Sequence, residues 1–164
     1  MILNNVGEIN ELLLFDVSGD RYAIDAASVE EIIFIPHETL IPSDSSAMSI
    51  ISHKSEIFTT VSLRSVLSEA PVSALDDDSR LAIIAEMKIA DGSTISGGLK
   101  RLAFKISDNP PYRDAVDFGS REVPSAAQFN RNYLTHILYD KLDDNRQIKF
   151  VDLKIMVGEM FYND

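Results

Sequence analysis

The chain has 164 residues, no cysteine and a formal net charge of −11. This length suits one domain or two small ones, and it is enough to bury about 70% of the unfolded surface without help from a metal or a disulfide. The missing cysteines exclude disulfides, thiol nucleophiles and cysteine-ligated zinc, and the negative charge argues against nucleic acid as a partner.

The first predicted element is a hairpin over residues 11–25. Leu13, Phe15 and Val17 recur at every second position, as in a strand with one buried face. Gly19, in the Ser-Gly-Asp turn, can take the positive φ that a tight hairpin needs. Asp25 then begins either a short capped helix or a loop that enters a strand. The apolar run that ends before Pro36 favours a strand at its end.

The central stretch of the sequence is residues 56–69, where a strand pattern changes to helical spacing after Ser62, a good N-cap. Residues 147–159 repeat this design at an offset of 90, with Asp152 as the cap. An internal repeat of this kind would determine the architecture. The alternative is that any two apolar strands followed by a turn look alike.

The second half of the chain continues the strand pattern. A Pro-containing acidic segment at 71–79 is expected to be a connection, and residues 112–130 are expected to be irregular. Further strands are predicted at 81–85, 99–106 and 133–141, and a turn at 143–145. Many short strands with frequent turns indicate an all-β fold. With the repeat, we expect two small barrels, formed approximately by residues 11–70 and 80–160.

No catalytic or metal-binding motif is found. His37, His53 and His136 have no metal-ligand spacing, and the sequence has neither a G-x-S-x-G elbow nor a P-loop. The start of the chain has no signal-peptide pattern, and no apolar run reaches the length of a membrane span. We therefore expect a cytoplasmic binding module that is not an enzyme, has no cofactor or metal and does not insert into the membrane.

Apolar residues in excess of two small cores could form an interaction surface. The candidates are Ile33, Phe34 and Ile35, together with Ile57 and Phe58. The alternative for each of them is a place in the core.

The order of these motifs resembles the CheW-like domain family of bacterial chemotaxis adaptors. The resemblance rests on residues 14–24 (LFDVSGDRYAI), 29–32 (VEEI), 50–64 (IISHKSEIFTTVSLR) and 151–153 (VDL). It implies one CheW-like domain over residues 1–164, with two five-stranded SH3-like barrels and one or two short helices. It also implies a scaffold in two-component signal transduction, which couples the cytoplasmic tips of chemoreceptors to the regulatory domain of a histidine kinase.

Some residues depart from the family pattern. Lys54-Ser55 stands where the family has an Arg-Gly turn, and Thr59 and Ser62 stand where it has Pro and Asp. Lysine keeps the charge of arginine but not its planar fork. We therefore expect a divergent accessory member, for example in a system that controls surface motility. The alternative is a small-molecule sensor or carrier that uses the groove between the barrels.

Five residues are expected near partner-facing surfaces by this resemblance: Val29, Glu31, Lys54, Ile57 and Arg64. For Glu31 and Arg64, an ion pair with each other inside the molecule is the alternative.

Overall fold

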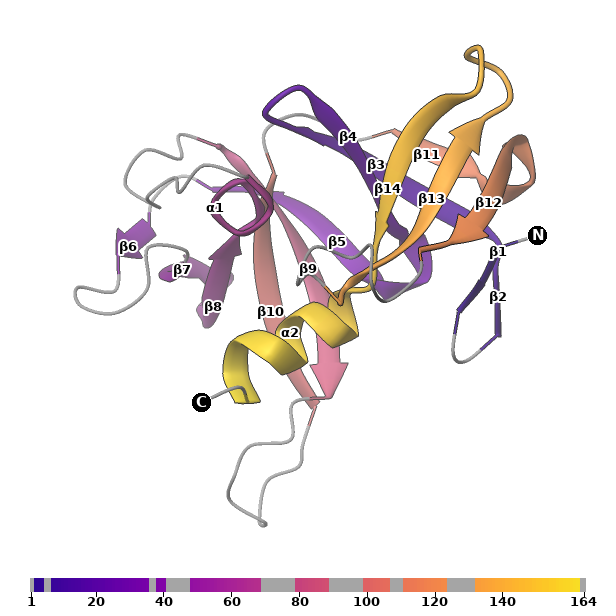
Figure 1. Ribbon diagram of the computed structural model, residues 1–164. Coiled ribbons are helices and arrows are strands. Elements are labelled where there is room, and N and C mark those ends of the chain that lie inside the picture. The colour runs from indigo at the N-terminus through magenta and orange to yellow at the C-terminus, as the bar shows by residue number, and fades with distance from the viewer. Residues whose placement is uncertain are drawn as a thin grey trace.

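The computed structural model describes residues 2–4, 7–35, 38–40, 48–68, 79–88, 99–106, 111–123 and 132–162. These residues form short strands and few helices (Figure 1). The expected all-β architecture is therefore confirmed. A separate two-stranded hairpin at the N-terminal end joins β1 (Ile2–Asn4) to β2 (Gly7–Ile9). The expected acidic connection lies outside the described residues, except for Ser79.

The rest of the chain runs twice through one order of elements: a hairpin, an interrupted strand, a second hairpin and a helix. The first run is β3 (Glu11–Val17), β4 (Asp20–Asp25), β5 (Val29–Phe34), β6 (Glu38–Leu40), β7 (Met48–His53), β8 (Glu56–Ser62) and α1 (Leu63–Leu67). The second is β9 (Leu81–Lys88), β10 (Leu99–Ile106), β11 (Tyr112–Asp114), β12 (Phe118–Glu122), β13 (Leu134–Asp140), β14 (Arg146–Val151) and α2 (Leu153–Tyr162). The internal repeat is therefore confirmed.

Local chemistry explains how the repeated elements begin and turn. The Ser62 hydroxyl accepts a hydrogen bond from Ser65 N at the start of α1, and the Asp152 carboxylate accepts from the backbone of Lys154 and Ile155 at the start of α2. Both predicted caps are confirmed. Positive φ angles occur in pairs at the tips of three hairpins, as tight turns require. The residues are Ser18 and Gly19, Lys54 and Ser55, and Asp144 and Asn145.

The described residues also contain two short 3₁₀ turns, η1 (Ala26–Ser28) between β4 and β5 and η3 (Ala115–Asp117) between β11 and β12. Asp25 caps the first and Asp114 caps the second, each by accepting a bond from the backbone N–H two residues later. The capped-helix interpretation of Asp25 is therefore correct. Residues 112–122, expected to be irregular, instead form β11, η3 and β12. The sequence did not reveal these strands because each is too short for a clear alternating pattern.

The strands form two six-stranded sheets, ordered β11-β3-β4-β14-β13-β12 and β5-β9-β10-β8-β7-β6. In each sheet the two edge strands are consecutive in the chain, and only three residues separate them. Three residues span about 10 Å at most, so the opposite edges of each sheet must come close together and the sheet must curl into a barrel. If the interrupted edge strand is counted once, each barrel has the five strands expected from the family resemblance.

The two repeats exchange their first hairpins. The first barrel combines β3 and β4 with β11 to β14, and the second barrel combines β9 and β10 with β5 to β8. Parallel pairings, β4 with β14 and β8 with β10, join the exchanged hairpins to the other repeat. The expected halves 11–70 and 80–160 therefore match the repeats but not the barrels. Strand periodicity identifies strands, but it does not identify their partners.

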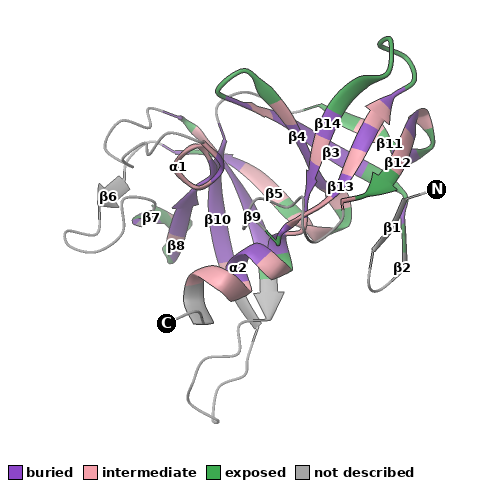
Figure 2. Cartoon of the chain, in the orientation of Figure 1, coloured by how far each residue is buried: buried purple, intermediate pink, exposed green. Residues whose placement is uncertain are grey.

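Each barrel has its own apolar interior, and a larger core lies between the barrels. On β3, Leu12 and Leu14 point into the first barrel, while Leu13 and Phe15 belong to this central core. Strands buried on both faces read as continuous apolar runs. Both helices add side chains to the central core, and Figure 2 shows the buried residues on β9, β10 and α2. The helices therefore hold the two barrels together.

Candidate partner-binding site

The β7–β8 hairpin exposes apolar side chains on the outer face of the second barrel. Ile57 is 74% exposed and Ile50 is 38% exposed, whereas their neighbours Phe58 and Ile51 are buried inside the barrel. Ser52 lies opposite Ile57 and Thr59 lies opposite Ile50, so the two isoleucines are diagonal neighbours on one face. The hairpin therefore offers an apolar surface on a rigid two-stranded frame.

The turn of this hairpin places Lys54 in solvent. Lys54 and Ser55 have φ angles of +50° and +64°, a left-handed conformation that is unfavourable for residues with a side chain. The Lys54 side chain is 76% exposed, and its Nζ lies 4.0 Å from Glu31 Oε2. The turn thus keeps the tight geometry that an Arg-Gly pair would give, at some cost in strain.

A β-bulge on β5 brings two successive carboxylates to the end of the second barrel. Val29 is paired with Ala85 and Glu31 with Ile84, so Glu30 is an extra residue in the strand. A bulge redirects the side chains next to it. As a result, Glu30 binds Arg101 and Glu31 binds His53, although adjacent strand residues normally point to opposite faces.

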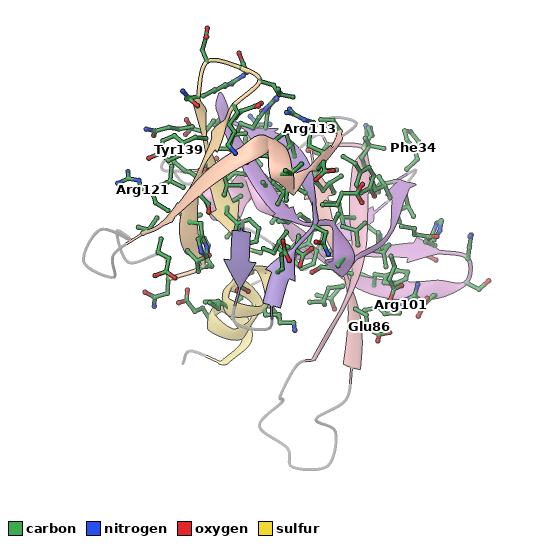
Figure 3. All side chains as sticks on the ribbon, turned by 90° about the vertical axis from the view of Figure 1, so that its right-hand side faces the viewer. Phe34, Glu86, Arg101, Arg113, Arg121 and Tyr139 are labelled. Atoms are coloured by element: carbon green, nitrogen blue, oxygen red, sulfur yellow. The ribbon has the colours of Figure 1, made fainter. Side chains whose placement is uncertain are left out.

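Arg101 on β10 links strands on both sides of the barrel end. Its Nε lies 2.8 Å from Glu30 Oε2, its Nη1 lies 2.5 Å from Glu56 Oε2, and its guanidinium lies 5.3 Å from the centre of the Phe58 ring. The hydrogen bond to Glu30 raises the pKa of Arg101 above its usual value. Arg101 also lies opposite Glu86 in the β9–β10 register, and Figure 3 shows the two near each other.

His53, the last residue of β7, completes this charged cluster, which we define as Glu30, Glu31, His53, Glu56 and Arg101. His53 Nε2 lies 3.0 Å from Glu31 Oε1. The members of the charged cluster come from four strands, so their contacts connect β5 with β7, β8 and β10. The cluster therefore holds the β7–β8 hairpin in place beside the exposed isoleucines.

The structure brings four of the five expected residues to this end of the second barrel. Glu31, Lys54 and Ile57 lie in or beside the charged cluster, and Val29 is next to it on β5 but packs partly against the central core. Arg64 lies elsewhere, on α1. Because Glu31 binds His53 and Lys54, it does not form the pair with Arg64 that the sequence left open.

Sequence reasoning missed Ile50 and Arg101 as members of the site. Ile50 could have been found from the alternation along residues 48–53, since it shares a face with Ser52 and not with buried Ile51. Nothing in the sequence indicates that Arg101 meets Glu30, which is 71 positions away. Of the apolar candidates, Phe34 is 63% exposed, whereas Ile33, Ile35 and Phe58 are buried.

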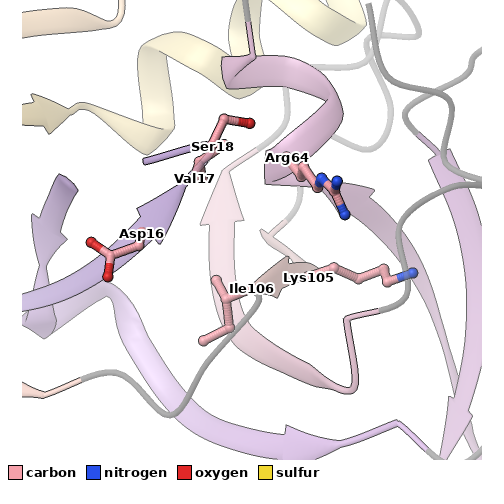
Figure 4. Close-up of a pocket in the computed structure, with 6 residues that line it drawn as sticks. All are labelled: Asp16, Val17, Ser18, Arg64, Lys105 and Ile106. Carbon is pink, nitrogen blue, oxygen red and sulfur yellow. The ribbon is translucent and has the colours of Figure 1, made fainter. Parts of the chain in front are cut away.

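Arg64 lines a small pocket between the barrels, with a cavity volume of about 140 Å³. The other lining residues are Asp16, Val17, Ser18, Lys105 and Ile106. Arg64 and Lys105 extend side by side, and Asp16 lies on the far side of the pocket (Figure 4). The Lys105 side chain is only 1% exposed despite its charge. The pocket therefore lies where α1, β3 and β10 meet, with exposed Ser18 at its rim.

The first barrel has a comparable contact, in which the acidic and the basic residue have exchanged strands. Arg113 on β11 donates two hydrogen bonds of 3.1 Å to the carboxylate of Asp140, at the end of β13, and lies 4.9 Å from the centre of the Phe118 ring. The Arg113 bond holds the pKa of Asp140 below its usual value. In the second barrel the corresponding strands, β5 and β7, carry the acid Glu31 and the base His53. Both barrels thus have an acid–base side-chain contact between these strands, with the acid and the base exchanged.

No metal site and no membrane-spanning helix are found in the described part of the chain. Its His, Asp and Glu side chains form no group of three that could hold a metal ion. His136, buried beside Phe150, and Asp140 do not share a ligand site. Neither described helix combines the length and the apolar character that a membrane span requires.

Comparisons with known proteins agree with this geometry. The crystal structure of the scaffolding protein TtCheW from Thermoanaerobacter tengcongensis superimposes with a TM-score of 0.61 at 18% identity, over 91% of this chain and 92% of that chain. A search of curated protein sequences gives no match. The model of the CheW-like domain matches residues 11–96, more than half of the sequence. The chain therefore belongs to the CheW-like domain family.

Proposed function

We propose that the protein is a non-catalytic adaptor of a bacterial chemosensory system, which couples the cytoplasmic tips of receptors to the regulatory domain of a histidine kinase. Membership of the CheW-like family supports a scaffold role. The altered Lys54-Ser55 turn supports a divergent accessory member. Such a protein acts in the cytoplasm and reaches the membrane only through its receptors.

The observation that carries this proposal is the exposed Ile57 on a hairpin held by ion pairs. Ile57 is 74% exposed, so folding buries little of its apolar surface, and its burial by a partner could contribute up to about 2 kcal/mol. The charged cluster fixes the hairpin before binding, so little conformational entropy is lost on association. The role of the site is to present this preformed apolar surface, with Lys54 at its edge.

The test is a binding titration of the purified protein with the kinase regulatory domain and, separately, with a receptor-tip fragment from the same organism. We expect Ile57→Ser to weaken binding to at least one of them by about tenfold, because truncating a central apolar contact costs more than 1 kcal/mol. Lys54→Glu should weaken the same interaction.

Leu142→Ser provides the matched control, because Leu142 is 71% exposed but lies on the first barrel. It should leave the interaction that Ile57→Ser weakens unchanged. Failure of the unaltered protein to bind either partner would overturn the proposed function. If Ile57→Ser bound both partners as tightly as the unaltered protein, the binding site would lie outside the β7–β8 hairpin.

A small-molecule sensor or carrier has less support. The pocket at Arg64 and Lys105 has a volume of about 140 Å³, whereas ligand pockets usually measure roughly 300 to 1,000 Å³. A thermal-shift screen in which a metabolite raises the unfolding temperature would favour this alternative.

A further inference from the structure

The first barrel carries a second group of exposed apolar side chains. Tyr112 is 47% exposed, Val116 69% and Leu142 71%. They belong to β11, to η3 and to the turn after β13, and in Figure 1 these elements lie on the opposite side of the molecule from β7 and β8. This group is therefore separate from the candidate site described above.

Hydrogen bonds hold η3 against the turn after β13. The backbone N–H of Lys141 donates to Asp117 O at 3.0 Å, and Lys141 Nζ donates to Val116 O at 3.5 Å. Leu142 follows Lys141 directly, so Val116 and Leu142 project from two segments that are tied together. These hydrogen bonds therefore fix the positions at which Val116 and Leu142 are exposed.

A groove with a volume of about 320 Å³ runs beside Val116. Buried Ile9 and Ala115 give it an apolar wall, Glu8 and Asp114 add two carboxylates to its lining, and Asn10 and Lys141 complete it. A groove of this composition suits a side chain with an apolar body and a positively charged end.

Negative charge at this groove is only partly neutralised within the described part of the chain, because the lysine that lines it, Lys141, faces the carboxylates of Glu8, Glu11 and Asp114. Asp114 lies directly opposite Glu11 in the β3–β11 register, and like charges in that position destabilise a sheet. Of the nearby cations, Arg113 is paired with Asp140, whereas Lys141 donates only to the neutral Val116 carbonyl and keeps its positive charge at the groove. One lysine against three carboxylates leaves this surface negative. The adjoining sequence segments 1–7 and 107–110 contain no Lys or Arg.

The spacing of the carboxylates argues against a metal ion as the missing counter-charge, since they form no described group that could hold one. Several separate positive side chains would suit them better. Because the groove and the exposed residues beside it are apolar, the partner that carries these positive side chains must also carry apolar side chains.

We propose that this first-barrel surface, formed by Glu8, Glu11, Tyr112, Asp114, Val116 and Leu142, binds a basic segment of a partner protein that also carries apolar side chains. An apolar side chain of the segment covers Val116 and Leu142 beside the groove, and its Lys or Arg residues pair with Glu8, Glu11 and Asp114. The inference does not depend on the β7–β8 site. Together, the two surfaces would let one chain bridge two partners that lie on opposite sides of it.

The test uses the full-length protein, labelled with ¹⁵N, and a short peptide of the repeat Lys-Leu-Lys-Ser as the probe. We expect saturable amide shifts confined to residues near 8–11, 112–116 and 141–142, and weaker binding at higher salt. Glu11→Lys should lower the affinity about fivefold, because it replaces an attracting charge with a repelling one. Val116→Ser should lower it by a similar factor.

Glu86→Lys is the control, since it makes the same charge change at an exposed strand position of the second barrel. Because it places a lysine opposite Arg101, its unfolding midpoint is measured as well. Glu86→Lys should leave peptide binding unchanged. Glu11→Lys should fold, because it turns a like-charge pair with Asp114 into an opposite-charge pair, and its unfolding midpoint verifies this. The proposal is overturned if Glu86→Lys weakens binding equally, if polylysine binds as tightly as the probe, or if the shifts lie elsewhere.

Discussion

At the scale of single residues, the turn of the β7–β8 hairpin contains backbone strain that one substitution could relieve. Ser55 has a φ of +64°, where a side chain is disfavoured and glycine is not. We expect Ser55→Gly to raise the free energy of unfolding by about 0.5 to 1 kcal/mol, since the relief of strain exceeds the added entropy of the unfolded chain. Urea denaturation measures this change.

Ser52→Gly is the control, because Ser52 lies in β7 on the same hairpin in extended conformation. Glycine weakens a strand interior, so this substitution should lower stability. If both glycine variants lowered stability alike, the strain assigned to Ser55 would be absent.

Two buried titratable groups predict how stability depends on pH. Burial lowers the pKa of His136, and the hydrogen bonds from Arg113 lower the pKa of Asp140. Both groups therefore bind protons more weakly in the folded than in the unfolded state, and stability is lost as the pH falls. The loss should begin below the unfolded pKa of each, about 6.5 for histidine and about 3.9 for aspartate.

Denaturation midpoints at a series of pH values test this prediction. His136→Asn should flatten the change that begins near neutrality and leave the more acidic one, whereas Asp140→Asn should lower stability by about 2 kcal/mol at neutral pH, because Arg113 loses a charged partner. Stability that rose on acidification from neutral pH would contradict the assignment.

At the scale of elements, the strand-to-helix junctions are the parts of the fold that the sequence predicts best. Ser62 and Asp152 each cap a helix whose apolar residues enter the central core. We expect Ser62→Ala to lower the free energy of unfolding by about 1 kcal/mol, the usual cost of losing a cap. Thermal or urea unfolding provides the measurement.

Ser65→Ala is the matched control within the same helix. The Ser65 hydroxyl is buried and finds no hydrogen-bond partner within the described part of the chain, so its removal should leave stability unchanged or raise it. Equal losses in the two variants would mean that the cap contributes nothing specific.

The candidate site could be predicted only in part from such elements. Local periodicity and turn chemistry place Lys54 at a hairpin tip and Ile57 on a strand, so these residues could be nominated from sequence. The choice between buried Phe58 and exposed Ile57 depends on which face of β8 meets the barrel interior. The bulge at Glu30 arises from the pairing of β5 with β9, and it has no local signature.

At the scale of the whole molecule, neither repeat can complete a barrel alone, because each barrel takes a hairpin from the other repeat. We therefore expect residues 1–75 expressed alone, and likewise residues 79–164, to show no cooperative unfolding transition. Co-expressed, the two fragments should assemble and recover it, since the central core contains residues of both. Circular dichroism during heating measures the transition.

The contrary outcome is easily recognised. A fragment that unfolded cooperatively by itself would mean that its strands form a barrel without the exchanged hairpin. As a control, the chain is divided after Asn145, within the β13–β14 turn, which leaves the first repeat whole. These two fragments, when co-expressed, should recover the cooperative transition less completely.

The sequence by itself determined the all-β fold class, the two repeats, the helix caps and the hairpin turns, because each is encoded by a local pattern of residues close together in the chain. The tertiary structure alone decided which repeat completes which barrel, that Arg101 joins Glu30 to Glu56, and that Tyr112, Val116 and Leu142 face solvent. These features arise from contacts between distant strands. Apolar patterning requires that a strand be paired and buried, but it leaves open which partner pairs with it.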